Sequence, residues 1–225
     1  MPAQEIVRKL KRLSNPKNVE GMKRFGINPH NTLGIPIPVL RKIAKDIGRD
    51  HAIALDLWSS GLHEGRILAS MIDDPDAVTE KQMESWVKHF DSWDDCDQVC
   101  MNLFSKTKSA YTKAAEWSAS DEEFVKRAGF ALMACLAWTD KKADDKQLER
   151  FLPLIKKASS DERNFVKKAV NWALRQIGKR NIRLNKKAIA TARIIQKTDS
   201  KSARWIANDA LRELEGAAVQ RRLTK

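Results

Sequence analysis

The sequence has few of the residues that mark secreted, metal-binding or disulfide-rich proteins. Its 225 residues include three cysteines, nine glycines, seven prolines and a single tyrosine. The cysteines Cys96, Cys100 and Cys135 are odd in number and lie in apolar periodic stretches. We therefore expect reduced thiols in a core rather than a disulfide framework. The histidines match no H-E-x-x-H spacing and the cysteines no C-x-x-C spacing, so we expect no metal and no cofactor.

Long apolar runs are also missing. No stretch reaches the roughly 18 apolar residues of a membrane span, and the first residues lack the uninterrupted apolar core of a secretory signal. We expect a soluble, cytoplasmic protein without membrane contact, associated with the nucleoid if the source is prokaryotic. The chain is long enough for one sizeable hydrophobic core but too short for two domains of comfortable size. This predicts one domain over residues 1–225. We expect it to be a monomer.

Acidic residues are the scarcer charged class. Lysine and arginine number 42 against 29 aspartates and glutamates, which gives a net charge of +13 and a pI near 9.8. Such a balance favours an anionic partner, which can be nucleic acid, an acidic membrane surface or an acidic protein. Charge alone does not choose among the three.

The periodicity of the apolar residues is helical along almost the whole chain. Periodic segments run for 10 to 17 residues, and little of the sequence shows the alternating β-branched pattern of strands. Pro36 and Pro38 open one predicted helix, and Gly48 ends it. The chain is therefore predicted to be all-α.

Some helical segments repeat. Residues 120–138, "SDEEFVKRAGFALMACLAW", and residues 160–179, "SDERNFVKKAVNWALRQIGK", share an S-D-E start and an F-V-K-basic-A stretch. The "ALRQI" of the second segment returns as "ALREL" at 210–214, and "EGRILASMI" at 64–72 is a weaker relative. A period near 40 residues in a helical chain is typical of stacked helix pairs of the HEAT or armadillo kind. Such a solenoid would present a concave face, here a basic one.

Two helix starts are predicted from capping-box spacing. Ser120 precedes Glu123 by three residues, and Ser159 precedes Glu162 by the same interval. In a capping box the serine and the glutamate each satisfy a backbone N–H at the beginning of a helix. We therefore expect helices to begin beside these two serines.

The predicted helix at 165–179, "FVKKAVNWALRQIGK", carries a tryptophan on its polar side. At about 100° per residue, its apolar residues fall on one line along the helix, and four other residues fall on a line on the opposite side. The apolar line consists of Val166, Val170, Ala173 and Ile177, and the opposite line of Lys168, Trp172, Arg175 and Lys179. Exposing an indole to water forfeits its hydrophobic gain, so Trp172 among three cations suggests a binding surface.

The equivalent helix at 123–138 repeats this arrangement. Its buried line is predicted to be Val125, Gly129, Leu132 and Leu136, and Arg127 points away from that line. Cations opposite a core line are often merely solvated. In a stack of repeats, however, they would align along one groove and could follow a phosphate backbone.

The segment 91–104, "DSWDDCDQVCMNLF", places an indole beside a carboxylate. Cys96, Val99, Cys100 and Leu103 form its predicted core line, which leaves Trp93 and Asp97 together on a flank. One interpretation is structural: Asp94 or Asp95 caps the helix, Asp97 adds charge near its start, and Trp93 is half-buried. The other is chemical, because a carboxylate in a phosphate-binding groove is repelled by the ligand unless it has a reaction to assist.

These motifs resemble the AlkD-like DNA alkylation repair family of HEAT-like-repeat DNA glycosylases. The resemblance rests on "LGIPIPVLRKIAKDI", "SWDDCD", "FVKRA" and "FVKKAVNWALRQ", in this order, and covers about residues 33–212. It implies a site made of Asp97, Trp93, Arg127 and Trp172, and excision of cationic N3- or N7-alkylated purines from double-stranded DNA without flipping the base into a pocket. Asp97, Trp93 and Trp172 are then the candidate catalytic residues.

The candidate DNA-binding residues come from the basic helix faces and from the predicted helix at 36–48. They are Arg127, Lys168, Arg175, Lys179, Arg41 and Pro38. Asp97 has no lysine beside it that could form a Schiff base with the sugar. We therefore expect a monofunctional glycosylase without lyase activity. The other tryptophans are expected to pack in the core or between helices; they are Trp58, Trp86, Trp117, Trp138 and Trp205.

Two other classes of function remain open. A non-catalytic binder of branched or distorted DNA would use the same basic surface and leave Asp97 idle. A HEAT-type scaffold for an acidic protein would leave Trp93, Asp97 and Trp172 unexplained. Excision activity separates the first class from an enzyme, and DNA affinity in moderate salt separates the second.

Overall fold

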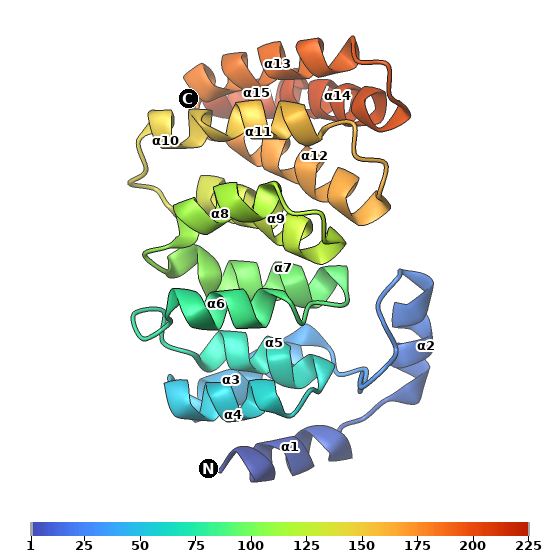
Figure 1. Ribbon diagram of the computed structural model, residues 1–225, viewed down its shortest axis with the longest axis vertical. Helices are drawn as coiled ribbons and strands as arrows, with labels where there is room; N and C mark the ends of the chain where they lie inside the picture. Colours follow the sequence, from blue (N-terminus) through green and yellow to red (C-terminus); the bar gives the residue numbers. More distant parts are fainter. Residues whose placement is uncertain (1, 225) are drawn as a thin grey trace. The chain divides into compact units, whose positions relative to one another are not determined.

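The computed structural model describes residues 2–224, which form α-helices, one short 3-10 helix and loops, with no strand in that range (Figure 1). The predicted all-α class is confirmed. By its internal contacts the chain divides into two compact units, the first ending at Lys108 and the second starting at Ser109. The single domain over residues 1–225 stays a prediction. No helix within the described range is both long and apolar enough to cross a membrane.

In the first unit, α5 is the central helix and packs against several of the others. The central helix contacts α3, α4 and α7, and α1 lies against α4. The helices of this unit are α1 (Ala3–Arg12), α2 (Pro16–Arg24), α3 (Ile37–Ile47), α4 (His51–Ser59), α5 (His63–Ile72), α6 (Glu80–Val87), α7 (Trp93–Asn102) and the 3-10 helix η1 (Phe104–Lys106). The arrangement brings the start of α7 next to the start of α5, although about 30 residues separate them in the sequence.

The second unit is built around α9 and α12, which pack on each other. The helix α8 covers α9, and α13 and α14 both pack on α12. The helices of this unit are α8 (Ala110–Ser118), α9 (Glu123–Thr139), α10 (Asp145–Glu149), α11 (Phe151–Ala158), α12 (Asn164–Gly178), α13 (Ile182–Gln196), α14 (Lys201–Leu214) and α15 (Ala217–Leu223). The two segments that the sequence identified as repeats are thus neighbouring, equivalent helices.

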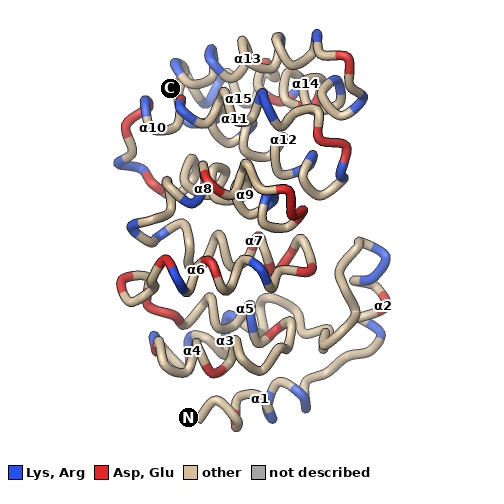
Figure 2. Tube along the Cα trace, viewed as in Figure 1, with Lys and Arg blue, Asp and Glu red and all other residues tan. Residues whose placement is uncertain are grey.

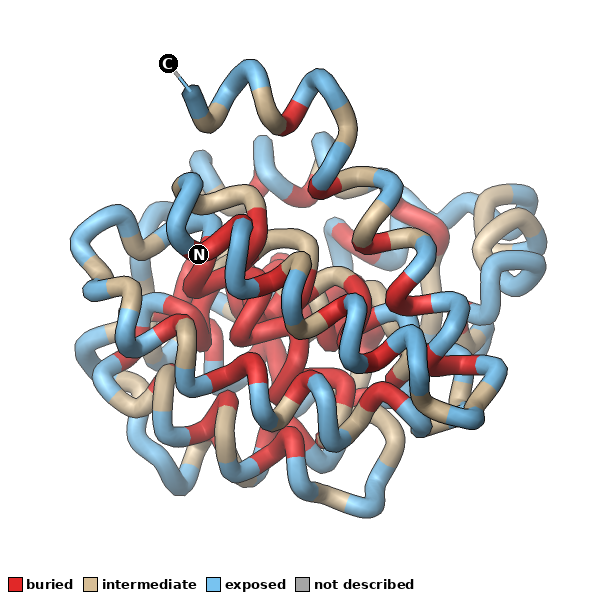
Figure 3. Tube along the Cα trace, turned by 90° about the horizontal axis from the view of Figure 1, so that it is seen from above, coloured by how far each residue is buried: buried red, intermediate tan, exposed pale blue. Residues whose placement is uncertain are grey.

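The predicted core lines are confirmed. On α12 the apolar line is fully buried, and on α9 the residues of the predicted line are also buried. Figure 3 shows buried residues recurring in short stretches along the helices, separated by exposed ones, as an amphipathic helix requires. Cys96, Cys100 and Cys135 are buried and form no disulfide, which confirms the predicted core thiols.

The helix boundaries confirm one prediction. The helix α3 follows Pro36, contains Pro38 in its first turn, and ends at Gly48, whose φ of 80° is accessible to glycine at little cost. Glycine therefore ends this helix as the sequence indicated.

The two capping-box predictions are wrong. The helix α9 begins at Glu123, after Glu122, and the hydroxyl of Ser120 accepts from the Glu122 N–H in the preceding turn, at 3.1 Å. The helix α12 begins only at Asn164. Glu162 instead accepts from the Ser200 hydroxyl at 2.8 Å, at the beginning of α14. Glu162 therefore acts at the beginning of α14 rather than of α12, because tertiary packing brings the start of α14 within reach.

Candidate functional site

Trp93 and Asp97 lie one turn apart on the same flank of α7. Both side chains are half-buried, whereas Cys96, Val99 and Cys100 on the adjoining core line are fully buried. The indole N–H of Trp93 donates to the carbonyl oxygen of Phe25, at 3.0 Å. The ring is therefore fixed by a segment far away in the sequence, and the flank predicted from the periodicity exists.

The carboxylates at the start of α7 do not cap it. The N-cap position is Ser92, and no side-chain capping bond is present there. Asp94 and Asp95 turn toward α5 instead: the Nε2 atom of His63 lies 2.9 Å from Asp94 Oδ2, and Arg66 lies 3.8 Å from Asp95 Oδ2. The capping interpretation is wrong because these acids have closer partners on the neighbouring helix.

Burial and neighbouring charges shift the pKa values of two groups in this network, His63 and Asp95. Burial alone would lower the pKa of His63, but the hydrogen bond to Asp94 and the charges of Asp94, Asp95 and Glu64 raise it to about 9. Burial raises the pKa of Asp95 to about 7, against the opposing charge of His63. At neutral pH His63 is thus a buried cation, held by acids at the beginning of α7.

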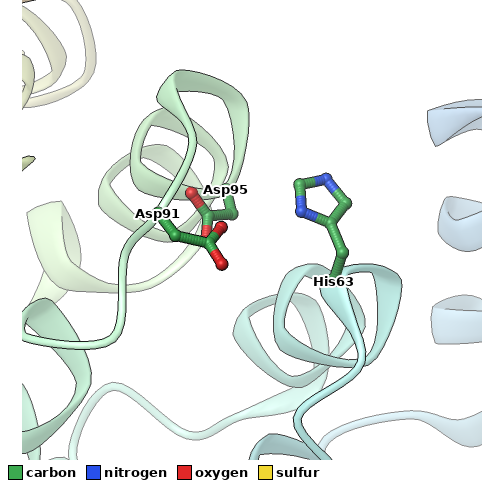
Figure 4. A group of neighbouring side chains, drawn as sticks. All are labelled: His63, Asp91 and Asp95. Atoms are coloured by element: carbon green, nitrogen blue, oxygen red, sulfur yellow. The ribbon is translucent and has the colours of Figure 1, made fainter. Parts of the chain in front are cut away.

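The same network contains a group of residues that could hold a metal ion. Figure 4 shows the imidazole of His63 facing the carboxylates of Asp91 and Asp95, and one ligand atom from each lies within 4.8 Å of the others. Arg66, however, lies 3.9 Å from Asp91 and 3.8 Å from Asp95. Its guanidinium supplies positive charge to both carboxylates, so the cluster is accounted for as an ion-pair network.

His63 and Arg66 were missed by the sequence reasoning. The histidine opens α5, and about 30 residues separate it from Asp94. No motif or spacing links the two positions. Figure 2 shows acidic residues gathered where α7 begins, and three aspartates within five residues were the one signal that a cationic partner was required.

A pocket of about 280 Å³ opens beside Trp93 in the first unit. From α7 it is lined by Trp93, Asp94 and Gln98, and from α5 by His63 and Glu64. The remaining walls are apolar and come from α2, the segment before α3, and α5. The carboxylate of Glu64 accepts from the backbone N–H groups of residues 33–35, which fixes the turn that forms one wall.

In the second unit, Lys168 and Trp172 lie one turn apart on α12. Lys168 is exposed and Trp172 half-buried. The two cations further along the same face are ion-paired with α14: Arg175 lies 2.9 Å from Glu213, and Lys179 lies 2.7 Å from the same carboxylate. The expected row of solvent-facing cations is therefore interrupted, because α14 packs along α12 and brings acids against its last two turns.

Arg127 does not face solvent. Its side chain is buried, with 5% of the residue exposed, and it donates to the carbonyl oxygen of Phe165 at 2.6 Å. The expectation of an outward cation on α9 is wrong because α9 is covered by both α8 and α12. A helix enclosed in this way is buried almost all round.

The other residues predicted from sequence fall in different surroundings. Pro38 and Arg41 are exposed on α3. Trp58 and Trp86 stack at 3.9 Å in the core, and Trp117 is also buried, as expected. For Trp138 the expectation of packing is wrong, because it is 55% exposed. Trp205 of α14 is 41% exposed and packs against Lys167 of α12, whose ammonium lies 5.3 Å from the ring centroid. The roles of the predicted catalytic and DNA-binding residues stay predictions.

A comparison with protein families assigns the chain. Residues 6–214 match the family model of the DNA alkylation repair enzymes. The chain belongs to this family.

Two known proteins are similar to this member of the DNA alkylation repair family. An uncharacterized protein of Listeria innocua, Lin0241, is 23% identical over 192 residues, which is 84% of each chain. A solved structure of "a new family of proteins related to the HEAT-like repeat DNA glycosylases with affinity for branched DNA structures" matches with a TM-score of 0.79 and 19% identity, over 95% of each chain. The HEAT-like-repeat fold predicted from the 40-residue period is thereby confirmed.

Proposed function

We propose that this protein is a DNA glycosylase that hydrolyses the N-glycosidic bond of cationic alkylated purines, of the 3-methyladenine or 7-methylguanine type, in duplex DNA. The observation that carries the proposal is the flank of α7, where Trp93 and Asp97 are half-buried one turn apart. Membership of the DNA alkylation repair family and the positive net charge of +13 support DNA as the partner.

Hydrolysis of this glycosidic bond requires stabilisation of the positive charge that develops on the sugar. An alkylated N3 or N7 purine is already cationic, so it leaves with the electrons of the glycosidic bond as a neutral base, and little general acid is required. The sugar passes through an oxocarbenium-like state, which a nearby carboxylate stabilises. In this proposal Asp97 performs that role and orients the attacking water, which adds to the anomeric carbon and releases a proton.

The surroundings of α7 would hold these groups in place. The Trp93 ring is fixed by Phe25, and the first turn of α7 is tied to α5 through Asp94 and His63. A site whose groups are already oriented spends no free energy on reorganisation during the reaction. An indole face adds cation–π attraction of about 0.5 to 2 kcal/mol to a cationic purine or sugar.

A second candidate is a protein that binds branched DNA without excising a base. One observation favours it: the Arg127 side chain, which the family resemblance places in the site, is buried and bonded to a backbone carbonyl. The matching solved structure is also of a family with affinity for branched DNA.

Release of alkylated bases separates the two candidates. Purified protein is incubated with methylated duplex DNA, and free 7-methylguanine and 3-methyladenine are measured. We expect release by the wild type and a rate lower by about 100-fold or more in Asp97→Asn, because loss of a preorganised charge costs about 3 kcal/mol at the transition state. Binding to undamaged DNA should hold or tighten, since a charge that repels phosphate is removed.

The matched control is Asp56→Asn, which removes an exposed carboxylate from α4 in the same unit. It should release bases at the wild-type rate. If Asp97→Asn also works at the wild-type rate, Asp97 is not the catalytic carboxylate. If the wild type binds DNA well and releases no base, the branched-DNA binder is the correct function.

A further inference from the structure

A pocket in the second unit combines an exposed indole with four cations. It has a volume of about 350 Å³ and lies where α9, α12 and α15 end. Its aromatic and charged walls are Trp138, Lys141, Lys179, Arg180 and Arg222. None of these residues except Lys179 belongs to the surface predicted from the sequence.

The arginines are held in place by helix ends. Arg180 donates to the carbonyl oxygen of Ala137 at 3.2 Å, and Arg222 donates to that of Lys179 at 2.8 Å. The carbonyls at the end of a helix lack partners within it and attract cations. A guanidinium has five N–H donors, so one bond to a carbonyl leaves most of its capacity to other acceptors.

The charge of the pocket is strongly positive. Lys179 is paired with Glu213 at 2.7 Å, which offsets one of the four cations. Lys141 is exposed on the loop after α9, and Arg222 is exposed on α15. Several cations converging on one hollow favour a ligand with phosphate groups.

Trp138 indicates which kind of phosphate ligand the pocket fits. The residue is 55% exposed, although burial of an indole lowers the free energy relative to exposure to water. Sites for single-stranded nucleic acid pair cations that follow the backbone with aromatic rings on which bases stack. In a continuous duplex the base faces are covered by their neighbours, so an indole finds a bare face only at an unpaired nucleotide.

We propose that this pocket binds an unpaired nucleotide of a DNA strand, with its base stacked on Trp138 and its flanking phosphates on Lys141, Arg180 and Arg222. Such nucleotides occur at flaps, gaps and branch points. The inference rests on the proposed DNA binding and is independent of base excision. It assigns the second unit a preference for DNA structure in addition to the proposed affinity for duplex.

The test compares two fluorescently labelled DNAs, a duplex and the same duplex carrying a five-nucleotide single-stranded flap. We expect the wild type to bind the flap DNA more tightly. Trp138→Ala should weaken flap binding by about fivefold or more, the lower end for loss of one base–aromatic stack, with little change for the duplex. Trp138→Phe should restore most of the preference, because a phenyl ring also stacks. Lys141→Ala should reduce the salt dependence of flap binding by about one phosphate contact.

The matched control is Trp205→Ala, which removes another exposed indole, over which Lys167 lies at 5.3 Å. It lies outside the pocket and should keep the flap preference. Equal flap and duplex affinities in the wild type, or a Trp138→Ala variant that keeps the preference, would overturn the inference while leaving duplex binding intact. Absence of binding to either DNA would instead reject DNA as the partner, and the proposed function with it.

Discussion

At the level of single residues, His63 is the buried cation of the charged network between α5 and α7. It is a buried imidazole between Asp94 and Asp95, and Glu64 and Arg66 complete the charged groups around it. An uncompensated charge in such a place would cost several kcal/mol, so each member of the network depends on the others. The network also joins α5 to the helix that carries Trp93 and Asp97.

The raised pKa of His63 predicts a stability that falls with rising pH. The folded state binds a proton more tightly than the unfolded state, with a pKa of about 9 against 6.5. The stabilisation is fully present below pH 6.5 and is lost as the pH rises through 9. We expect the free energy of unfolding to fall by about 2 to 3 kcal/mol across this window, measured by urea denaturation.

Substitution at His63 should remove this dependence. His63→Gln is expected to flatten the fall between pH 6.5 and 9 and to be less stable than the wild type at pH 6.5, because the buried acids lose their cation. The matched control, His30→Gln, changes an exposed histidine of the same unit and should keep the wild-type slope. Identical slopes in both variants would show that His63 is not the titrating group. Asp95 adds a similar fall at lower pH, because its raised pKa of about 7 also favours the protonated folded state.

At the element scale, close approach of α8 and α9 organises the centre of the second unit. Gly129 lies where the two helices meet: a Cβ atom there would lie 2.5 Å from the backbone nitrogen of Ser118 and 2.9 Å from the carbonyl carbon of Trp117. Backbone atoms cannot move aside as a flexible side chain does. The glycine is therefore required by packing, in agreement with its place on the predicted core line.

Gly129→Ala should separate these helices. We expect a loss of about 1 to 3 kcal/mol in the free energy of unfolding, the usual cost of overpacking, with a corresponding fall in Tm. The control is Gly21→Ala on α2, where an added Cβ meets nothing within 4 Å. That variant should gain about 0.5 to 1 kcal/mol from the higher helix propensity of alanine. If Gly129→Ala is as stable as the wild type, α8 and α9 lie further apart than in this structure, and the glycine is not required by packing.

Across the whole molecule, the net charge is +13, but the lysines and arginines behind it are of two kinds. Some are exposed to solvent, and others are paired with carboxylates. Lys168 on α12 is exposed, whereas Arg175 on the same helix lies between Asp209 and Glu213 of α14. A cation already paired with carboxylates displaces fewer counterions when phosphate approaches. Formal charge therefore overstates the number of phosphate contacts that the chain can make.

This difference predicts unequal effects on the salt dependence of duplex binding. Lys168→Ala should reduce the slope of log affinity against log salt by about 0.9, the value for one phosphate contact. Arg175→Ala should change the slope less. As a control, Lys187→Ala on α13 removes a cation paired with Glu149 and should leave the slope unchanged. If Lys168→Ala keeps the full slope in a fluorescence-anisotropy titration, Lys168 makes no phosphate contact.

The helical period and the repeat were enough to predict the all-α fold and the core lines of α9 and α12. They were enough because a period of 3.6 residues fixes which side chains share a face, whatever packs against it. The same reasoning placed Trp93 and Asp97 on one flank of α7. It failed at the starts of α9 and α12, because Ser120 accepts from the turn before α9 and Glu162 accepts from the start of α14.

The helical pattern along the chain is sufficient to establish the fold class, the core faces and the common flank of Trp93 and Asp97. The burial of Arg127, the ion pair of Arg175 with α14 and the exposure of Trp138 among cations follow from the packing of distant segments. The physical reason is that periodicity gives the direction of a side chain relative to its own helix. Whether water, a carboxylate or another helix occupies that direction depends on segments far away in the sequence, and no local pattern contains that information.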